Sequence, residues 1–245
     1  MTQVTATHTF KRFDGELAHL HWMVTEMGAA VSVQLEKAME AFRGQDYGAA
    51  RAVIEADRRI DQLEASGDAE ILQLIARHAP QASDLRRVIA VSKSITDLEQ
   101  VGDEAVRIAS LLFEMGDEHP AESADKLGSA LDEVAVRAFG LLKRSLLLFE
   151  AFQMEDAIEV IEGHQQMDGH FQRSLHDAMR LIRDEQLSVG LAVSHVLVAK
   201  SLDRIAHHAL NLAEYALFER SGEDLRTQQP RESQEDSLMP KREKT

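Results

Sequence analysis

Apolar residues recur at intervals of three and four along most of the chain, which is the period of an amphipathic helix. The first such segment carries Leu17, Leu20, Met23, Met27, Val31, Leu35 and Met39. Comparable patterns predict helices at about residues 13–42, 46–77 and 83–113, and again at about 125–151, 154–184 and 188–219. These segments are longer than an average helix, which is typical of helical bundles. The pattern therefore predicts an all-α protein with six long helices.

The two sets of three helices are related by an internal repeat. An offset of 107 residues takes Val53-Ile54-Glu55 onto Val160-Ile161-Glu162, and an offset of 104 takes Leu98 onto Leu202. A long repeat with one small change of offset indicates duplication. We therefore expect two tandem three-helix bundles, at residues 10–116 and 125–220, joined by a linker at 117–124.

The two ends of the chain lack the helical pattern. Residues 221–245 are polar and charged, with no hydrophobic period. Such a segment cannot bury enough apolar surface to offset its ordering entropy. We expect a disordered C-terminal tail at 221–245 and a flexible N-terminus at 1–9.

The charge balance narrows the classes of function. The chain has 42 acidic against 27 basic residues, a formal net charge of −15, and no cysteine. Binding to a nucleic-acid backbone depends on Lys and Arg, so a nucleic-acid partner is not expected. Disulfides and thiolate metal sites are excluded, and no apolar run reaches membrane-spanning length. The sequence is that expected of a soluble, cytoplasmic protein.

Candidate chemistry lies in paired side chains at helical spacing. Residues four apart share one face of a helix, so each pair aims two ligand groups in the same direction. The same arrangement occurs at equivalent places in both repeats. The predicted metal ligands are Asp57, Asp61, Glu99 and Asp103 at site one, and His164, Asp168, Asp203 and His207 at site two.

A solvated acidic face is the plain alternative, since an acidic chain forms some such pairs by chance. Two observations favour metal binding. The pairs are interleaved with apolar residues, and in the second repeat two acids are replaced by histidines, which keeps the capacity to bind metal. Site one is expected to accept harder cations, magnesium and calcium included. Site two is expected to prefer transition metals such as iron, zinc, nickel or manganese.

Four stretches around these motifs resemble the PhoU family of phosphate-signalling regulators. They are VIEADRRIDQLE (53–64), ASDLRRVIAVSKSITDLEQVGDEAVRIA (82–109), VIEGHQQMD (160–168) and KSLDRIAHHALNLAEY (200–215). The resemblance spans residues 10–219 and implies two three-helix bundles that bind metal clusters through acidic E/D-x-x-x-D motifs. The chain departs from the family at His164 and His207, where acids are usual.

The resemblance implies an accessory protein of high-affinity phosphate uptake that is not an enzyme. Such a protein links the ATPase of the phosphate ABC transporter to a sensor histidine kinase and suppresses phosphate-starvation genes when phosphate is plentiful. It is expected to be a homodimer, associated with the membrane only through its partners.

Two other functions stay open. A di-metal carboxylate enzyme would draw Glu-x-x-His motifs from two helices of a four-helix bundle, and this chain has one, Glu16 to His19. A phosphotransfer bundle would use an exposed histidine such as His164, although the equivalent residue in the first repeat is Asp57. No P-loop or G-x-G-x-x-G motif is present, so nucleotide binding is not expected.

Overall fold

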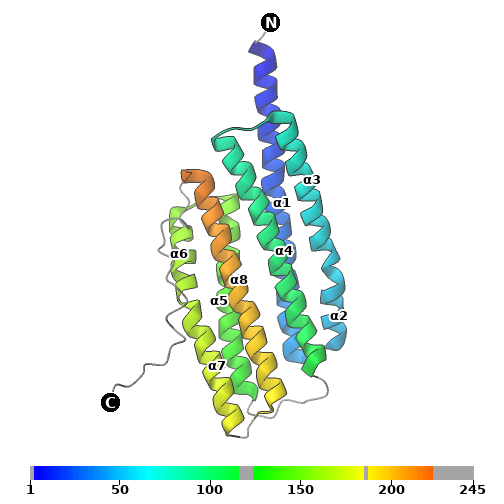
Figure 1. Cartoon of the computed structure of the whole chain (residues 1–245), viewed down its shortest axis with the longest axis vertical. Helices are drawn as coiled ribbons and strands as arrows, with labels where there is room; N and C mark the ends of the chain where they lie inside the picture. Colours follow the sequence, from blue (N-terminus) through cyan, green and yellow to red (C-terminus); the bar gives the residue numbers. More distant parts are fainter. Residues whose placement is uncertain (1–2, 116–123, 185–186, 223–245) are drawn as a thin grey trace, which may run out of the picture.

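Helices make up nearly all of the described chain, and they fall into two sets (Figure 1). The computed structural model describes residues 3–115, 124–184 and 187–222. The first repeat contains α1 (Gln3–Gly44), α2 (Tyr47–Ala56), α3 (Arg58–His78) and α4 (Ser83–Met115). The second contains α5 (Ala124–Glu150), α6 (Met154–Gln165), α7 (Met167–Arg183) and α8 (Val189–Ser221). The predicted all-α fold of two tandem three-helix bundles is confirmed.

The middle helix of each bundle is divided, where the sequence predicted one continuous helix. In the first repeat the division falls at Asp57, whose backbone keeps helical dihedral angles (φ −57°, ψ −32°). Its carbonyl accepts hydrogen bonds from the N–H groups of Ile60 (2.7 Å) and Asp61 (3.2 Å). The chain therefore makes one tight turn and continues as a helix. The second repeat divides at Gln166.

The ends of the helices differ from the prediction most at the N-terminus. Helix α1 begins at Gln3, ahead of the predicted start at residue 13, and extends through most of the segment predicted to be flexible. Its first turns project beyond the other helices (Figure 1), which is consistent with a helix that propagates outward from its packed part. The predicted linker at 117–124 and the predicted tail at 221–245 lie almost entirely outside the described residues.

Side-chain caps begin two of the helices. Asp46 accepts a hydrogen bond from the N–H of Ala49 at 2.9 Å and starts α2. Ser188 accepts one from the N–H of Leu191 at 3.1 Å and starts α8. Each cap satisfies a backbone donor that the helix itself leaves open, and such caps are typically worth about 1 kcal/mol.

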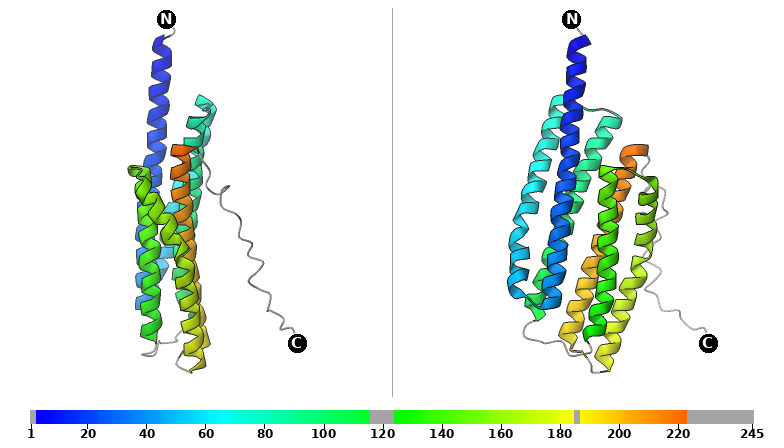
Figure 2. Two further views of the ribbon diagram at one scale, coloured as in Figure 1. Left: turned by 90° about the vertical axis from the view of Figure 1, so that its left-hand side faces the viewer. Right: turned by 180° about the vertical axis from the view of Figure 1, so that it is seen from behind.

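The long helices of both repeats form a common core. Helices α4 and α8 pack against each other, α1 packs on α4 and α5, and α5 packs on α8. Helices α2–α3 and α6–α7 flank this group on its two outer sides (Figure 2). Leu35, Leu98, Leu142 and Leu202 are almost completely buried, and each stabilises the fold by about 1.5–3 kcal/mol. The two bundles are thus packed side by side, with the α4–α8 contact at their junction.

In the part of the chain that the structure describes, no helix combines the length and the apolar character that crossing a membrane requires.

Candidate metal centres and the groove between the repeats

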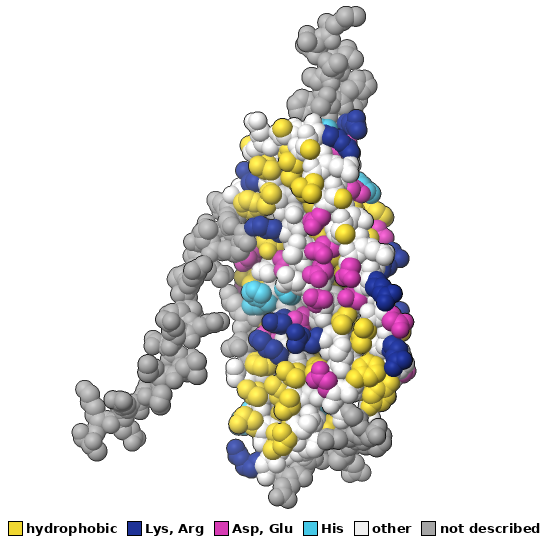
Figure 3. All heavy atoms as spheres, turned by 45° about the vertical axis from the view of Figure 1, so that its right-hand side comes forward, with side chains coloured by type: hydrophobic (Ala, Val, Ile, Leu, Met, Phe, Trp, Pro, Cys, Tyr) yellow, Lys and Arg dark blue, Asp and Glu magenta, His cyan; other side chains and the backbone are white. Residues whose placement is uncertain are grey.

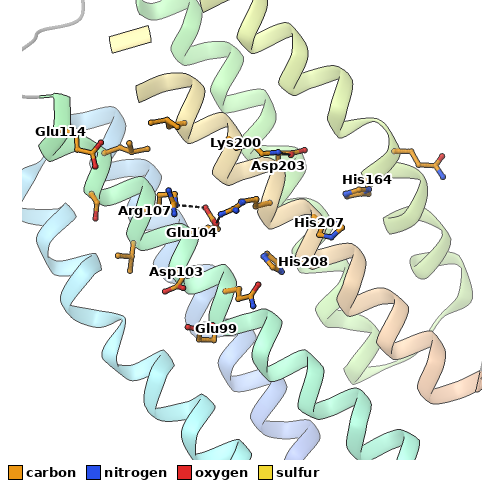
Figure 4. A pocket seen from close by; sticks show the side chains of 17 residues that line it. Glu99, Asp103, Glu104, Arg107, Glu114, His164, Lys200, Asp203, His207 and His208 are labelled. Atoms are coloured by element: carbon orange, nitrogen blue, oxygen red, sulfur yellow. Dashed lines mark hydrogen bonds and ion pairs between the residues drawn. The ribbon is translucent and has the colours of Figure 1, made fainter. Parts of the chain in front are cut away.

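A groove of about 1300 Å³ runs between α4 and α8 and reaches the end of α6. Five of the eight predicted ligands line it: Glu99, Asp103, His164, Asp203 and His207. Glu99 and Asp103 come from α4, whereas His164 and His207 come from α6 and α8 on the other side (Figure 4). Candidate ligands of both repeats therefore meet along one concave surface, whereas Asp57 and Asp61 are not part of its lining.

Site one is an electrostatically coupled cluster of carboxylates. Burial raises the pKa of Glu99 to about 7, helped by the negative charges of Asp103, Glu64, Asp61 and Asp57. This coupling shows that the four predicted ligands of the first repeat lie close enough to repel one another. Figure 3 shows acidic side chains gathered on this face, beside histidines and basic side chains. A divalent cation would relieve the repulsion, so this donor set fits such an ion.

Asp57 is held in place by two neighbours that the sequence did not point to. The Nε2 atom of Gln34 donates a hydrogen bond to Asp57 Oδ1 at 2.9 Å. A Cβ atom added at Gly102 would lie 3.3 Å from the same oxygen, so α4 approaches the Asp57 turn more closely than a side chain there would comfortably allow. Burial raises the pKa of Asp57, opposed by the Gln34 hydrogen bond and reinforced by Asp61 and Asp103.

Glu64 is a fifth acid in this cluster, and it was absent from the prediction. Burial raises its pKa, as do the charges of Asp68, Asp61 and Asp103. A signal was present in the sequence, because Glu64 lies three residues after Asp61 and therefore on the same helix face. The comparison of the two repeats did not point to Glu64, because an offset of 107 takes it onto Phe171, which cannot bind metal.

Site two is built around a pair of histidines. The ring centroids of His164 and His207 lie 5.5 Å apart, although the two residues belong to different helices. Burial lowers the pKa of His164, and a positive charge on His207 would lower it further, whereas Asp203 opposes the shift. Burial likewise lowers the pKa of His207, with His208 adding to the effect. Both imidazoles are thus favoured in the neutral form, the form that binds a transition metal.

The acids of site two are less well placed for metal binding. Asp203 forms an ion pair with Lys200 (Nζ to Oδ2, 2.7 Å), so the lysine competes with a metal ion for this carboxylate. Asp168 is in the first turn of α7, but its side chain lies outside the described residues. Among the described side chains, no three acidic or histidine groups are already arranged to hold a metal ion. Binding at either site would require some side chains to rotate.

Basic side chains also line the groove. Arg204 of α8 donates to Oε1 of Glu104 of α4 at 2.8 Å, across the junction of the repeats. Arg107 lies 3.7 Å from the other oxygen of Glu104 (Figure 4). Together with Lys200 these arginines line the groove beside the candidate metal ligands. Their positive charges keep the groove from being uniformly acidic.

His208 turns away from the metal motif and bonds to the first repeat. Its Nδ1 atom lies 2.6 Å from Oδ1 of Asp97, which also accepts a hydrogen bond from Asn211 at 3.1 Å. Burial acts to raise the pKa of Asp97, but the hydrogen bonds from His208, Asn211 and Tyr215 hold it below its ordinary value. The carboxylate therefore stays ionised inside the α4–α8 contact and fixes the two walls of the groove.

The single Glu-x-x-His motif lies on α1 and is occupied by other contacts. Glu16 forms ion pairs with Arg12, Arg77 and His78. His19 pairs with Glu70 at 3.2 Å. Neither residue lines the groove that holds the candidate metal ligands.

The chain is similar in sequence to phosphate-transport accessory proteins of bacteria. The chain is 31% identical over 234 residues to a phosphate-specific transport system accessory protein PhoU homolog of Burkholderia sp, covering 94% of this chain and 98% of that protein. It is 26% identical over 219 residues to the phosphate-specific transport system accessory protein PhoU of Escherichia coli, covering 89% of both.

Two solved structures resemble this one over most of the chain. The phosphate transport system regulatory protein PhoU of Streptococcus pneumoniae superposes with a TM-score of 0.78 at 26% identity, covering 86% of this chain and 98% of that one. PhoU of Pseudomonas aeruginosa gives a TM-score of 0.76 at 28% identity, covering 86% and 100%. The family model of the PhoU domain matches twice, at residues 24–112 and 131–216, one match within each three-helix bundle. The chain therefore belongs to the PhoU family.

Proposed function

We propose that this protein is a non-enzymatic regulator of phosphate uptake and phosphate signalling. The observation that carries the proposal is the pair of PhoU domains, which align with phosphate-specific transport accessory proteins over nearly their whole length. The protein acts as a negative regulator of the phosphate-starvation response. In this role it couples the ATPase of the phosphate ABC transporter to a sensor histidine kinase.

We also propose that the regulator binds metal ions at both candidate sites. Asp57, Asp61, Glu99 and Asp103 hold a cation at site one, and Glu64 is close enough to contribute. His164, Asp168, Asp203 and His207 hold a transition metal at site two. A metal bound there would neutralise repelling carboxylates and link helices of one bundle, which stabilises a single arrangement of the groove. The raised pKa of Glu99 and the neutral histidine pair support this assignment.

We propose that the protein works as a homodimer in the cytoplasm. Support for a protein contact comes from α1, where Trp22 is 55% exposed and stacks on His19. A large aromatic side chain left open to solvent is typical of interface residues. The absence of a membrane-crossing helix in the described residues is consistent with contact to the membrane through partners only.

A carboxylate di-metal enzyme is the second candidate, and no specific observation favours it. Glu16 and His19 are engaged in ion pairs on α1, away from the other candidate ligands. A phosphotransfer role for His164 is likewise disfavoured, because this side chain is half-buried against His207.

The proposal is tested by deleting the gene in its native host and measuring a phosphate-starvation reporter in phosphate-rich medium. We expect the reporter to become active and to be silenced again by the wild-type protein. The Asp61→Asn/Asp103→Asn variant should fold and yet fail to silence the reporter fully. A reporter that stays silent after deletion would argue against the regulatory role.

A further inference from the structure

A second pocket, of about 500 Å³, lies at the end of the molecule where α4 begins and where α5 and α8 end (Figure 1). It contains none of the candidate metal ligands and is separate from the groove described above. Its charged lining comes from three helices. The residues are His21 of α1, Asp84, Arg86 and Arg87 of α4, and Glu219 and Arg220 of α8.

This lining has an excess of positive charge in a strongly acidic protein. Three arginines and two carboxylates line the pocket. One of the carboxylates, that of Glu219, is already bonded to neighbouring side chains. Glu219 accepts a hydrogen bond from His21 at 3.0 Å and lies 3.4 Å from Nε of Arg87. Burial acts to raise the pKa of Glu219, but His21 and Arg87 hold it below its ordinary value. Among the described residues no ion pair joins a carboxylate to Arg86 or Arg220, and Arg220 lies over the ring of Phe152 at 5.6 Å. The pocket lining therefore carries one net positive charge.

Arg86 gives the clearest sign of a missing partner. Its Nε atom is buried and has no hydrogen-bond partner among the described residues. A buried donor left unpaired costs about 1–3 kcal/mol, so such groups usually meet a ligand or another acceptor. The guanidinium lies close to the backbone at the end of α8, since a Cβ added at Gly222 would lie only 2.9 Å from its Cζ atom.

The start of α4 adds to the positive potential. This helix is 33 residues long, and its N-terminus carries the positive end of the helix dipole. The preceding residue, Ala82, has a φ of 50° and no side-chain acceptor that could cap the helix. Arg86 and Arg87 follow within the next turn. The N–H groups of Asp84 and Arg86 already donate to the carbonyls of Gln81 and Ala82. The guanidinium groups that line the pocket are therefore the donors on which an anion would depend.

We propose that this pocket binds a phosphate group through Arg86, Arg87 and Arg220 at the N-terminus of α4. Guanidinium groups donate paired hydrogen bonds that match the oxygens of phosphate, which favours this anion over halides. The volume accommodates free phosphate and also a small phosphoester, and the two share this chemistry. The proposal does not depend on metal at the groove or on the regulatory role.

The arginine pair of α4 occurs in the first repeat alone. The offset of 104 that relates α4 to α8 takes Arg86 and Arg87 onto Gly190 and Leu191, which carry no charge. One phosphate group per chain is therefore expected. A site of this kind would allow the protein to respond to phosphate directly, at a place distinct from its candidate metal motifs.

Isothermal titration calorimetry of the full chain tests the proposal, at low ionic strength and with a chelator present so that metal-bound phosphate does not contribute. Inorganic phosphate is titrated in one arm and glycerol 3-phosphate in the other. We expect saturable binding of one equivalent in at least one arm, and the arm with tighter binding identifies the source of the phosphate group. No saturable binding in either arm would overturn the proposal.

Two variants locate the site. Arg86→Gln and Arg220→Gln each remove one charge, and each should weaken binding about tenfold or more, the size expected for one charge-assisted hydrogen bond. Arg220 is exposed, so its variant remains informative if Arg86→Gln folds poorly. Arg51→Gln on the exposed face of α2 is the matched control and should leave binding unchanged. Equal binding by the wild type and both pocket variants would place the anion elsewhere and contradict the proposal.

Discussion

The Nδ1 atom of His208 lies 2.6 Å from Oδ1 of Asp97, and this contact joins α8 of the second repeat to α4 of the first. Asp97 is only 7% exposed, so the pair sits inside the junction between the bundles. We predict that Asp97→Ala lowers the free energy of unfolding by about 1–3 kcal/mol, because it leaves His208 and Asn211 without their acceptor. Urea unfolding measures this change.

The control for this prediction is Glu55→Ala, which removes an exposed carboxylate from α2. It should change the free energy of unfolding by less than about 0.5 kcal/mol. Because the pKa of Asp97 lies below its ordinary value of 3.8, the stability it contributes is present at neutral pH and is lost as the pH falls below about 4. A loss equal to that of the control would show that the buried contact does not hold the repeats together.

Glu99 should make the metal-free protein less stable as the pH rises. Its pKa is about 7 in the folded protein against an ordinary value of 4.5, so the folded state binds more protons between these values. Stability from this residue therefore falls from about pH 4.5 to pH 7 and then levels off. We predict that Glu99→Gln raises the melting temperature at pH 8 in the presence of chelator, and leaves it nearly unchanged at pH 4.5.

The Glu99→Gln variant also distinguishes the effect of charge repulsion on stability from the effect of metal binding. Added magnesium or manganese at pH 8 should stabilise the wild type more than Glu99→Gln, because the variant has lost one ligand. Glu55→Gln serves as the comparison on an exposed face and should behave as the wild type does. If Glu99→Gln melts at the wild-type temperature at pH 8, the carboxylate cluster does not strain the fold.

The fold could be predicted from the sequence because the spacing of apolar residues shows directly where the helices lie. The division of the middle helix at Asp57 was missed, since neither glycine nor proline marks it and the turn departs from the helix by a single hydrogen-bond step. The early start of α1 was missed because residues 3–9 show no apolar period, although their backbone is helical.

The candidate site was predicted in part. The repeat comparison pointed to the ligand positions, and the structure brings Glu99, Asp103, His164 and His207 to one groove. The roles of Gln34 and Gly102 could not be predicted, because they arise where α1, α4 and the Asp57 turn meet in space. An offset of 107 takes Gln34 onto Leu141, and one of 104 takes Gly102 onto Ala206, so neither residue recurs in the second repeat.

Gly102 permits the close approach of α4 to Asp57, and this predicts a selective defect. In Gly102→Ala the new methyl group would lie 3.2 Å from Cγ2 of Ile60 and 3.3 Å from Oδ1 of Asp57. Crowding costs about 1–3 kcal/mol, partly offset by about 1 kcal/mol from the better helix propensity of alanine. We predict a small loss of stability together with weaker cation binding at site one, measured by thermal melting and metal titration.

Gly140→Ala is the matched control, since a Cβ at this position in α5 meets nothing within 4 Å. It should stabilise the protein by about 0.5–1 kcal/mol and leave metal binding unchanged. Full cation affinity in Gly102→Ala would mean that the position of Asp57 does not matter for the site.

We propose that both repeats carry metal through their paired motifs, and this proposal can be checked on the purified protein. Its most direct test is elemental analysis of untagged protein purified without chelator, beside Asp61→Asn/Asp103→Asn and His164→Ala/His207→Ala. We predict stoichiometric metal in the wild type, with each double variant losing the share of its own repeat while circular dichroism shows unchanged helicity. Wild-type protein without metal, or variants that keep their full metal content, would contradict the claim.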